Sequence, residues 1–190
     1  MKTKDRDIRE KLHCEFKKKY FNSEDTLIID ELSLCQGTAR IDVAVIKNCF
    51  HGYEIKSEKD NLSRLPNQIN IYNKVMDKMT VITGENHYDK ILDLVPDWWG
   101  IKVVVHTKSG INIVTKKRGK KNKSVNPYSI AQLLWKEEVL EILDQKGLSK
   151  GFKSKPRKVL WERLASSLPL KELQFIVRET LKNRKEWRVD

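Results

Sequence analysis

Two carboxylates and one ammonium group lie close together in the sequence, in segments whose pattern is typical of strands. Asp42 lies in the alternating segment 40–46, and Glu54 and Lys56 lie in the segment 53–57. On an extended strand, Glu54 and Lys56 share one face, and Asp42 points away from the apolar residues that alternate with it. A short turn between the two strands would bring the three side chains together.

A cluster of this kind suits Mg²⁺, with Mn²⁺ as an alternative, because hard cations prefer carboxylate oxygens and keep several bound waters. A bound metal acidifies a water molecule and neutralises charge on a phosphoryl group. Lys56 would orient that water or offset charge that develops in the transition state. Asp42, Glu54 and Lys56 are therefore predicted catalytic residues, and Asp42 and Glu54 are predicted metal ligands.

The elements that position these residues follow from hydrophobic periodicity and turn signals. We expect a helix at 5–20, strands at 27–32, 40–46 and 53–57, a helix at 63–77, a strand at 79–83, a short helix at 88–95, strands at 101–107 and 111–115 that turn at Ser109-Gly110, and helices at 129–145, 156–166 and 170–186. This order predicts an α/β fold with a central mixed sheet flanked by helices.

At these residues the sequence resembles a known superfamily. The segments 40–45 and 52–57 are similar to the D…ExK signature of PD-(D/E)xK nucleases, although Ile41 replaces the usual proline. Gln68 and Tyr72 in the next helix match the QxxxY pattern of the branch related to RecB nucleases. The motifs span residues 25–84, and residues 1–115 resemble, more loosely, an uncharacterised bacterial and phage branch.

The resemblance implies a restriction-endonuclease-like core and roles for further residues. Gln68 and Tyr72 would support catalysis, while Glu31 and the backbone carbonyl of Ile55 would help to bind the metal, with Glu24 or Glu15 in place of Glu31 as alternatives. Arg40 would contact a phosphate or pair with a carboxylate. The implied function is a divalent-metal-dependent nuclease, a hydrolase of phosphodiester bonds, in bacterial or phage defence or in DNA repair.

The positive charge is concentrated at one end of the chain. Residues 116–190 contain 20 Lys and Arg against 9 Asp and Glu, whereas residues 1–115 contain 18 against 17. A one-ended field of this kind suits a polyanion, DNA in preference to RNA, although a solubilising tail stays an alternative. The predicted nucleic-acid-binding residues are Arg40, Lys116, Lys117, Arg118, Lys120, Lys121, Lys150, Lys153, Lys155, Arg157 and Lys158.

Three parts are predicted along the chain: a nuclease core at 1–115, a basic linker or mobile arm at 116–128, and a basic helical module at 129–190. Segments 140–151 and 160–164 resemble a SAP-type DNA-binding module, but the loop between them is longer than usual. Trp98 and Trp99 could stack on bases, although core packing is the commoner role for such residues.

Other interpretations stay open. The chain could bind nucleic acid without cutting it, or serve as a subunit of a repair or defence assembly, and a homodimer or a protein partner is compatible with the sequence. An odd number of cysteines, Cys14, Cys35 and Cys49, indicates reduced thiols and a cytoplasmic protein. No apolar run approaches the length that spans a membrane.

Overall fold

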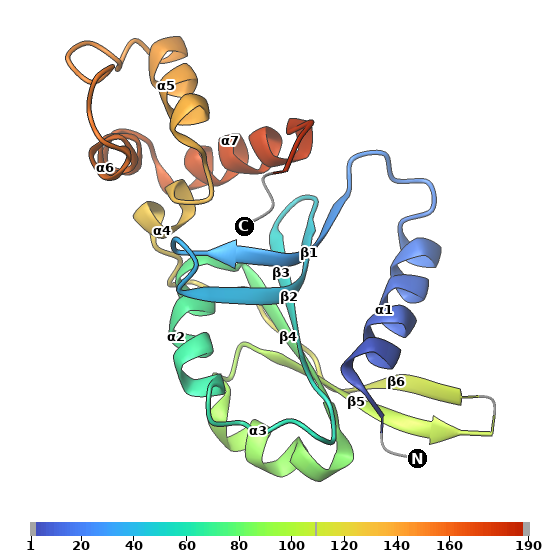
Figure 1. Ribbon diagram of the computed structural model, residues 1–190. Helices are drawn as coiled ribbons and strands as arrows, with labels where there is room; N and C mark the ends of the chain where they lie inside the picture. The colour runs from blue at the N-terminus through green and yellow to red at the C-terminus, as the bar shows by residue number, and fades with distance from the viewer. Residues whose placement is uncertain (1–2, 109, 188–190) are drawn as a thin grey trace.

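A computed structural model describes residues 3–108 and 110–187; the predicted turn residue Ser109 lies outside them. Six strands form one sheet in the order β1-β2-β3-β4-β5-β6 (Figure 1). Their bounds are β1 Leu27–Leu34, β2 Ala39–Ile46, β3 Phe50–Lys56, β4 Lys78–Gly84, β5 Gly100–Thr107 and β6 Gly110–Lys117. β3, β4 and β5 are parallel and the other pairs are antiparallel, so the predicted mixed α/β sheet is confirmed.

Helices cover both faces of the sheet. They are α1 Asp5–Lys19, α2 Leu65–Val75, α3 Tyr88–Leu94, α4 Pro127–Ala131, α5 Lys136–Gln145, α6 Arg157–Ser167 and α7 Leu170–Asn183, with a short 3-10 turn, η1, at Glu85–His87. Figure 1 shows α1 on one side of the sheet, α2 and α3 on the other, and α4–α7 together beyond the β1 edge. No helix in the ranges described is long and apolar enough to cross a membrane.

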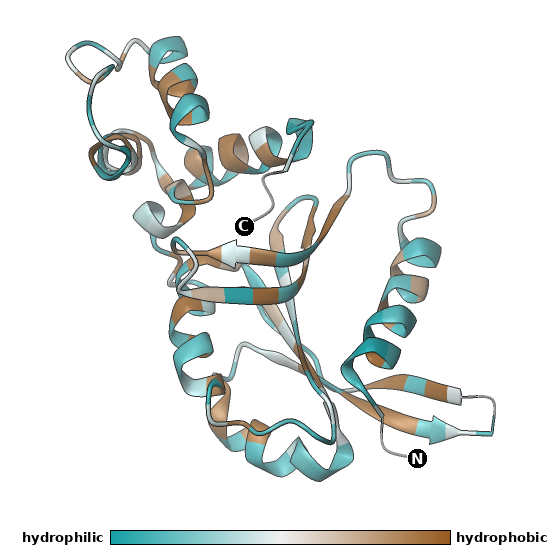
Figure 2. Cartoon of the chain, viewed as in Figure 1, coloured by the Kyte–Doolittle hydropathy of each residue, from teal (hydrophilic) through white to brown (hydrophobic). Residues whose placement is uncertain are grey.

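Two apolar layers hold the sheet between its helices. Ile8, Leu12 and Phe16 recur at helical spacing on α1. They form an apolar stripe that packs against Val43 and Tyr53 on the sheet face that α1 covers. The other layer joins α2, the opposite sheet face and the helical module, with Trp99 and Trp161 fully buried in it. Figure 2 shows this pattern as hydrophobic residues along the strands and along the inner sides of the helices.

The core role of Trp99 is confirmed. Its side chain is 0% exposed, its ring lies 6.1 Å from the ring of Tyr72, and its indole N–H donates to Asn73 Oδ1 at 3.0 Å. A buried tryptophan with a satisfied N–H contributes mainly to packing. Trp98 packs, partly buried, against the same layer.

The expected helix at 129–145 is wrong, because two helices occupy this region. α4 begins after Asn126, whose side chain accepts a hydrogen bond from Ser129 N at 2.9 Å and caps the helix. The chain then turns, and Trp135 N donates to Glu138 Oε2 at 2.7 Å where α5 begins. An uninterrupted apolar pattern hid this turn, because the residues between the helices are also buried.

The basic segment 116–123 packs against the core, where the sequence suggested a linker or a mobile arm. β6 continues to Lys117, and Gly119 lies so close to Gly100 that a Cβ at Gly119 would approach Gly100 N to 2.9 Å. Asn122 is 5% exposed and donates to the carbonyl oxygens of Asn73 and Met76. These hydrogen bonds join residues that are far apart in the sequence, so the basic composition of the segment alone gave no sign of them.

A buried carboxylate joins the helical module to the sheet. Asp77 Oδ1 accepts a hydrogen bond from Gln174 Nε2 on α7 at 2.7 Å, and Asp77 Oδ2 accepts one from Phe50 N at 2.9 Å. Asp77 is 2% exposed and Gln174 is 7% exposed, so the contact between α7 and the start of β3 and β4 excludes water. The division of the chain into a core, a linker and a helical module, with boundaries after residues 115 and 128, stays a prediction.

Candidate functional site

The strands and α2 bring five predicted residues into one polar cluster: Asp42, Glu54, Lys56, Gln68 and Tyr72. β2 and β3 pair antiparallel with Val43 opposite Tyr53, which places Asp42 across from Glu54. Lys56 follows Glu54 by two residues on the same face of β3. Gln68 and Tyr72 lie one helical turn apart on α2 and both point toward Glu54.

Glu54 lies at the centre of the cluster and is 1% exposed. Its Oε1 accepts hydrogen bonds from Lys56 Nζ at 2.6 Å and from Gln68 Nε2 at 2.8 Å. Its Oε2 accepts a hydrogen bond from Tyr72 Oη at 2.7 Å. Three donors satisfy this buried carboxylate, and the Lys56 ammonium balances its charge.

Gln68 and Tyr72 hold the cluster in place through further contacts. Gln68 Oε1 accepts a hydrogen bond from Lys56 Nζ at 3.1 Å, so the amide binds both members of the ion pair. The Tyr72 hydroxyl also contacts the backbone carbonyl of Arg40 at 2.8 Å. Burial and the negative charge of Glu54 raise the pKa of Tyr72 well above its ordinary value, so its hydroxyl stays a donor.

Asp42 has a different environment from Glu54. Its Oδ2 accepts a hydrogen bond from Ile55 N at 2.6 Å, and its side chain is 19% exposed. Burial, followed by repulsion from Glu54, raises the pKa of Asp42 to about 7, while the hydrogen bond from Ile55 N opposes this rise. Burial and the nearby Glu54 carboxylate therefore make a negative charge on Asp42 unfavourable.

Arg9 on α1 adds positive charge beside Asp42, and it was not among the residues predicted from the sequence. Its guanidinium donates to the Asp42 backbone carbonyl at 2.8 Å and to Glu31 Oε1 at 2.6 Å, and it lies 3.4 Å from Asp42 Oδ1. Asp5 and Asp30 also lie within 4 Å of it. The spacing of Asp5 and Arg9 indicated a helical ion pair, but nothing local indicated contact with residues 31 and 42.

The remaining predicted ligands lie less centrally. Glu31 has a φ of +54°, and its carboxylate meets Arg9 at the mouth of the cluster instead of contacting Glu54. Ile55 contributes its backbone N–H to Asp42, while its carbonyl has no contact with the cluster among those observed. No group of three or more His, Cys, Asp and Glu in the described ranges is arranged to hold a metal ion.

Arg40 on β2 makes no ion pair with a carboxylate in the described ranges. Its side chain is exposed, and it lines a cavity of about 700 Å³ between β1 and the helical module. Trp135, Trp187 and Arg157 line the same cavity. The guanidinium of Arg184 lies 4.1 Å from the Trp135 ring and 4.5 Å from the Trp187 ring, which fixes the wall of the cavity beside α7.

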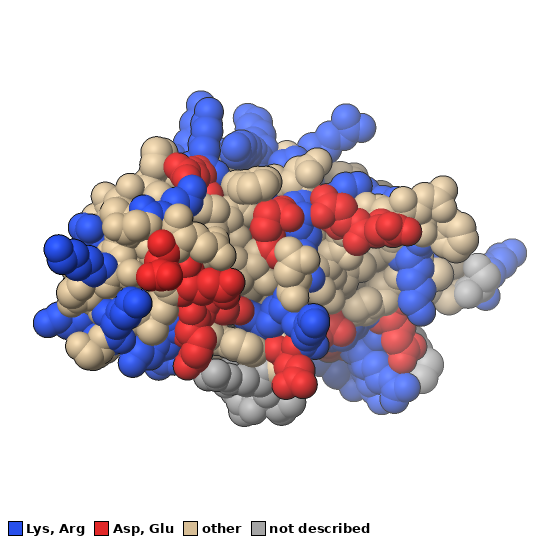
Figure 3. Space-filling model, turned by 90° about the horizontal axis from the view of Figure 1, so that it is seen from above, with Lys and Arg blue, Asp and Glu red and all other residues tan. Residues whose placement is uncertain are grey.

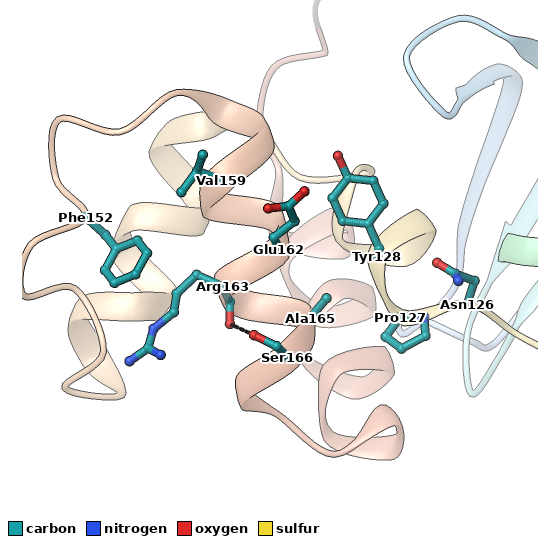
Figure 4. A pocket seen from close by; sticks show the side chains of 9 residues that line it. All are labelled: Asn126, Pro127, Tyr128, Phe152, Val159, Glu162, Arg163, Ala165 and Ser166. Atoms are coloured by element: carbon teal, nitrogen blue, oxygen red, sulfur yellow. Dashed lines mark hydrogen bonds between the residues drawn. The ribbon is translucent and has the colours of Figure 1, made fainter.

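A second cavity lies within the helical module, away from the polar cluster. It has a volume of about 600 Å³ and is formed by the start of α4, the segment before α6 and the outer side of α6. Figure 4 shows Glu162 pointing between Tyr128 and Val159, while the Arg163 guanidinium turns aside toward Phe152. The Arg163 guanidinium carbon lies 4.9 Å from the Phe152 ring. None of the residues that line this cavity belongs to the predicted site.

Apart from Arg40, the predicted nucleic-acid-binding residues fall in two groups. Lys116, Lys117, Arg118, Lys120 and Lys121 lie along the end of β6 and the segment after it, while Lys150, Lys153, Lys155, Arg157 and Lys158 surround the loop between α5 and α6. All except Lys117 are exposed. Lys153 lies 3.7 Å from Asp144, and the other nine make no ion pair with a carboxylate in the described parts of the chain.

The fold and site therefore define an α/β protein with a six-stranded mixed sheet, a buried Glu54–Lys56 cluster and a basic helical module. The model of the family described as Bacteriophage P4 protein cII matches residues 5–188, so the chain belongs to that family. The chain is 26% identical over 160 residues to Protein cII of Enterobacteria phage P4. The aligned region covers 84% of this chain and 60% of that protein. The chain thus spans about 60% of the length of this relative, and no solved structure matches.

This family assignment corrects several expectations. The identification as a PD-(D/E)xK nuclease with a SAP-like module is wrong, because one cII family matches both parts of the chain. The nuclease function, and with it the hydrolase, defence and repair roles, is wrong for the same reason. A few residues in the D…ExK and QxxxY spacing do not define a family, since a buried ion pair on one strand, hydrogen-bonded to a neighbouring helix, uses the same residues. Whether the chain catalyses a reaction is a separate question that the family match does not test, and catalysis as such stays a prediction.

Proposed function

We propose that the chain binds DNA, with the phosphate backbone as its main target. The carrying observation is the excess of 20 Lys and Arg over 9 Asp and Glu in residues 116–190. Such an excess draws a polyanion through release of condensed counterions. A cytoplasmic location is part of this proposal and is supported by the three free cysteines Cys14, Cys35 and Cys49.

The arrangement of charge on the helical module supports a particular contact surface. Seen from above, Figure 3 shows acidic side chains in a band across the middle of the molecule, with Lys and Arg projecting around its rim. DNA would therefore avoid this band and meet the rim. The exposed residues at the loop between α5 and α6, here called the α5–α6 basic surface, are Lys150, Lys153, Lys155, Arg157 and Lys158.

Neutralising part of this surface tests the proposal. We expect Lys150→Gln/Lys155→Gln/Lys158→Gln to weaken binding to a labelled DNA duplex at least about tenfold near 0.15 M salt, since each lost phosphate contact lowers the salt slope by about 0.9. Fluorescence anisotropy over a salt series measures both quantities. The matched control, Lys59→Gln/Lys90→Gln/Lys108→Gln, removes the same charge from exposed positions beyond the carboxyl ends of β3, β4 and β5. Equal weakening by both variants would contradict the proposal.

We also propose that Asp42 and Glu54 bind one Mg²⁺ ion. Mg²⁺ often takes one or two carboxylates from a protein and keeps most of its waters. Because hydrogen-bond donors already occupy both oxygens of Glu54, binding of the ion requires one of them to move away from the carboxylate. Burial, followed by repulsion from Glu54, raises the pKa of Asp42, and a cation would relieve the repulsion. When bound, the ion would supply positive charge for a phosphate oxygen. A restriction-endonuclease-like arrangement of the core stays part of the proposal, supported by the positions of Asp42, Glu54 and Lys56 on β2 and β3.

The metal proposal predicts a saturable rise of the melting temperature with MgCl₂. Binding to the folded state alone stabilises it by about 2.7 kcal/mol at a hundred times the dissociation constant. Asp42→Asn should abolish the rise, and Asp93→Asn, at an exposed position on α3, should keep it. A rise of equal size in Asp42→Asn would show that the ion acts elsewhere.

A further inference from the structure

Basic side chains from five different parts of the chain gather around the start of β3, on the opposite end of that strand from Lys56. We call this group the β3-start surface, and its members are Lys19 of α1, Lys47 of the turn before β3, Lys78 of β4, Lys121 of the segment after β6 and Arg178 of α7. Only Lys121 was singled out from the sequence. The other four are distant in sequence from it and from one another.

Direct contacts place three of these cations. Lys19 Nζ and Lys47 Nζ lie 5.2 Å and 5.9 Å from the centre of the Tyr20 ring. The Arg178 guanidinium lies 5.9 Å from the centre of the Phe50 ring, at the first residue of β3. These distances place the charged groups themselves over the faces of the aromatic rings, as in cation–π contacts.

Backbone pairing places the other two cations beside them. Lys78 lies opposite His51 in the parallel pairing of β3 with β4. Asn122 N donates to Asp77 O at 2.8 Å, which anchors the segment that carries Lys121 next to Lys78. Electrostatics agree with this placement. The pKa of His51 is lowered to about 3 by burial and then by Lys78, Lys19 and Lys102, so this ring adds no charge of its own.

Four of the carboxylates near the surface have partners, whereas Glu24, which lines a cavity with Lys47, makes no ion pair in the described ranges. Glu15 pairs with Lys102 at 3.4 Å, and both Asp25 and Glu179 bind Lys182. Asp77 is buried, and its two oxygens accept hydrogen bonds from Phe50 N and Gln174 Nε2. The five cations of the β3-start surface make no ion pair with any carboxylate in the part of the chain that the structure describes. Their mutual repulsion is a cost that a bound polyanion would remove.

We propose that the β3-start surface is a phosphate-binding surface that contacts the backbone of DNA, in addition to the α5–α6 basic surface. This inference rests on the proposed DNA binding and adds the region of contact on the sheet domain. Its cations lie on or beside packed strands and helices, so they present charge at defined positions. Phosphate contacts of this kind fix the orientation of a protein on a duplex without reading sequence.

The first test neutralises three lysines of the surface. Lys19→Gln/Lys47→Gln/Lys78→Gln is compared with the unchanged chain and with Lys59→Gln/Lys90→Gln/Lys108→Gln, whose lysines lie beyond the carboxyl ends of the parallel strands, about 20 Å away. If each lysine contacts a phosphate, the slope of log K against log salt becomes shallower by about 2.7, with the control unchanged. Melting curves of both variants verify that they fold.

The second test uses Cys49 in the unchanged chain. Cys49 lies beside Lys78, Arg178 and Lys121, so bound DNA should slow its alkylation at least about tenfold, as followed by peptide mass spectrometry. Cys35, which is also half-buried, lies at the other end of β2, about 25 Å away, and serves as the internal control.

The outcomes separate this inference from the function on which it rests. If the unchanged chain binds no DNA, the proposed function fails and the inference fails with it. If the chain binds DNA with a steep salt slope, but the lysine variant keeps that slope and Cys49 is alkylated at the same rate with and without DNA, the inference alone is overturned.

Discussion

Replacing Lys56 by methionine is expected to lower the free energy of unfolding by about 3–5 kcal/mol, the cost of leaving a buried charge without its partner. Lys56 is 5% exposed, and its ammonium lies 2.6 Å from Glu54 Oε1. Methionine has a similar length and packs in the same space, so the loss reports on charge and not on a cavity. Urea denaturation at pH 7.5 measures the change.

A second variant distinguishes this explanation from simple damage to the core. In Glu54→Gln/Lys56→Met both charges are absent. The introduced amide oxygen could accept from Gln68, while its NH2 group donates to the Tyr72 hydroxyl, whose proton is then donated to the Arg40 carbonyl, so most of the stability should return. Lys59→Met, at an exposed position, should change stability by less than about 0.5 kcal/mol. A double variant as unstable as Lys56→Met would contradict the role assigned to the ion pair.

The second large effect is a pH-dependent gain of stability in Asp42→Asn. The folded-state pKa of Asp42 is about 7, above its unfolded value of 3.8, mainly because of burial and then because of Glu54. Between these pH values the unfolded chain has lost the proton that the folded chain retains. The contribution of Asp42 to stability therefore falls as pH rises from about 4 to about 7, by up to about 4 kcal/mol, and does not change above that range.

Asparagine keeps an acceptor for Ile55 N but cannot ionise, so Asp42→Asn should match the unchanged chain near pH 4 and exceed its stability at pH 8. The measurement is the difference in unfolding free energy between the two chains from pH 4 to pH 9, with EDTA present. Asp93→Asn, on the exposed side of α3, should show no such trend. A difference that does not change with pH, or that favours the unchanged chain at pH 8, would contradict the environment described for Asp42.

Much of the fold followed from periodic patterns in the sequence. Alternation placed Asp42 on β2 and Glu54 on β3, and the turn between the strands brought the two carboxylates together. The helical spacing of Gln68 and Tyr72 likewise put both on the side of α2 that faces Glu54. These relations are local, because each depends only on the period of one element or on a short connection.

Other parts of the site depend on contacts between distant residues. Arg9 binds the Asp42 carbonyl across 33 positions of sequence, and Gln174 binds Asp77 across 97. Glu31 has a positive φ, which no pattern in the sequence indicated. The β3-start surface also brings together cations from five parts of the chain. Charge counted along the sequence assigned nearly the whole excess to residues 116–190 and overlooked Lys19, Lys47 and Lys78.

The positions of the predicted site residues did not determine the family of the chain. Asp42, Glu54 and Lys56 occupy the expected strands, yet the family match over residues 5–188 is to Bacteriophage P4 protein cII. A buried carboxylate needs donors wherever it occurs, and a lysine two residues away with a glutamine and tyrosine on a neighbouring helix supplies them. The same spacing thus serves a structural need, and a short motif alone does not identify a function.

The salt dependence of DNA binding by the unchanged chain tests most directly whether the chain binds the phosphate backbone of DNA. A labelled duplex is titrated with protein at several salt concentrations between about 50 and 300 mM, and log K is plotted against log salt. If the chain binds the phosphate backbone, we expect a straight line with a slope steeper than about −3, which corresponds to at least three phosphate contacts. No binding at about 50 mM salt, or binding whose affinity does not change with salt, would contradict it.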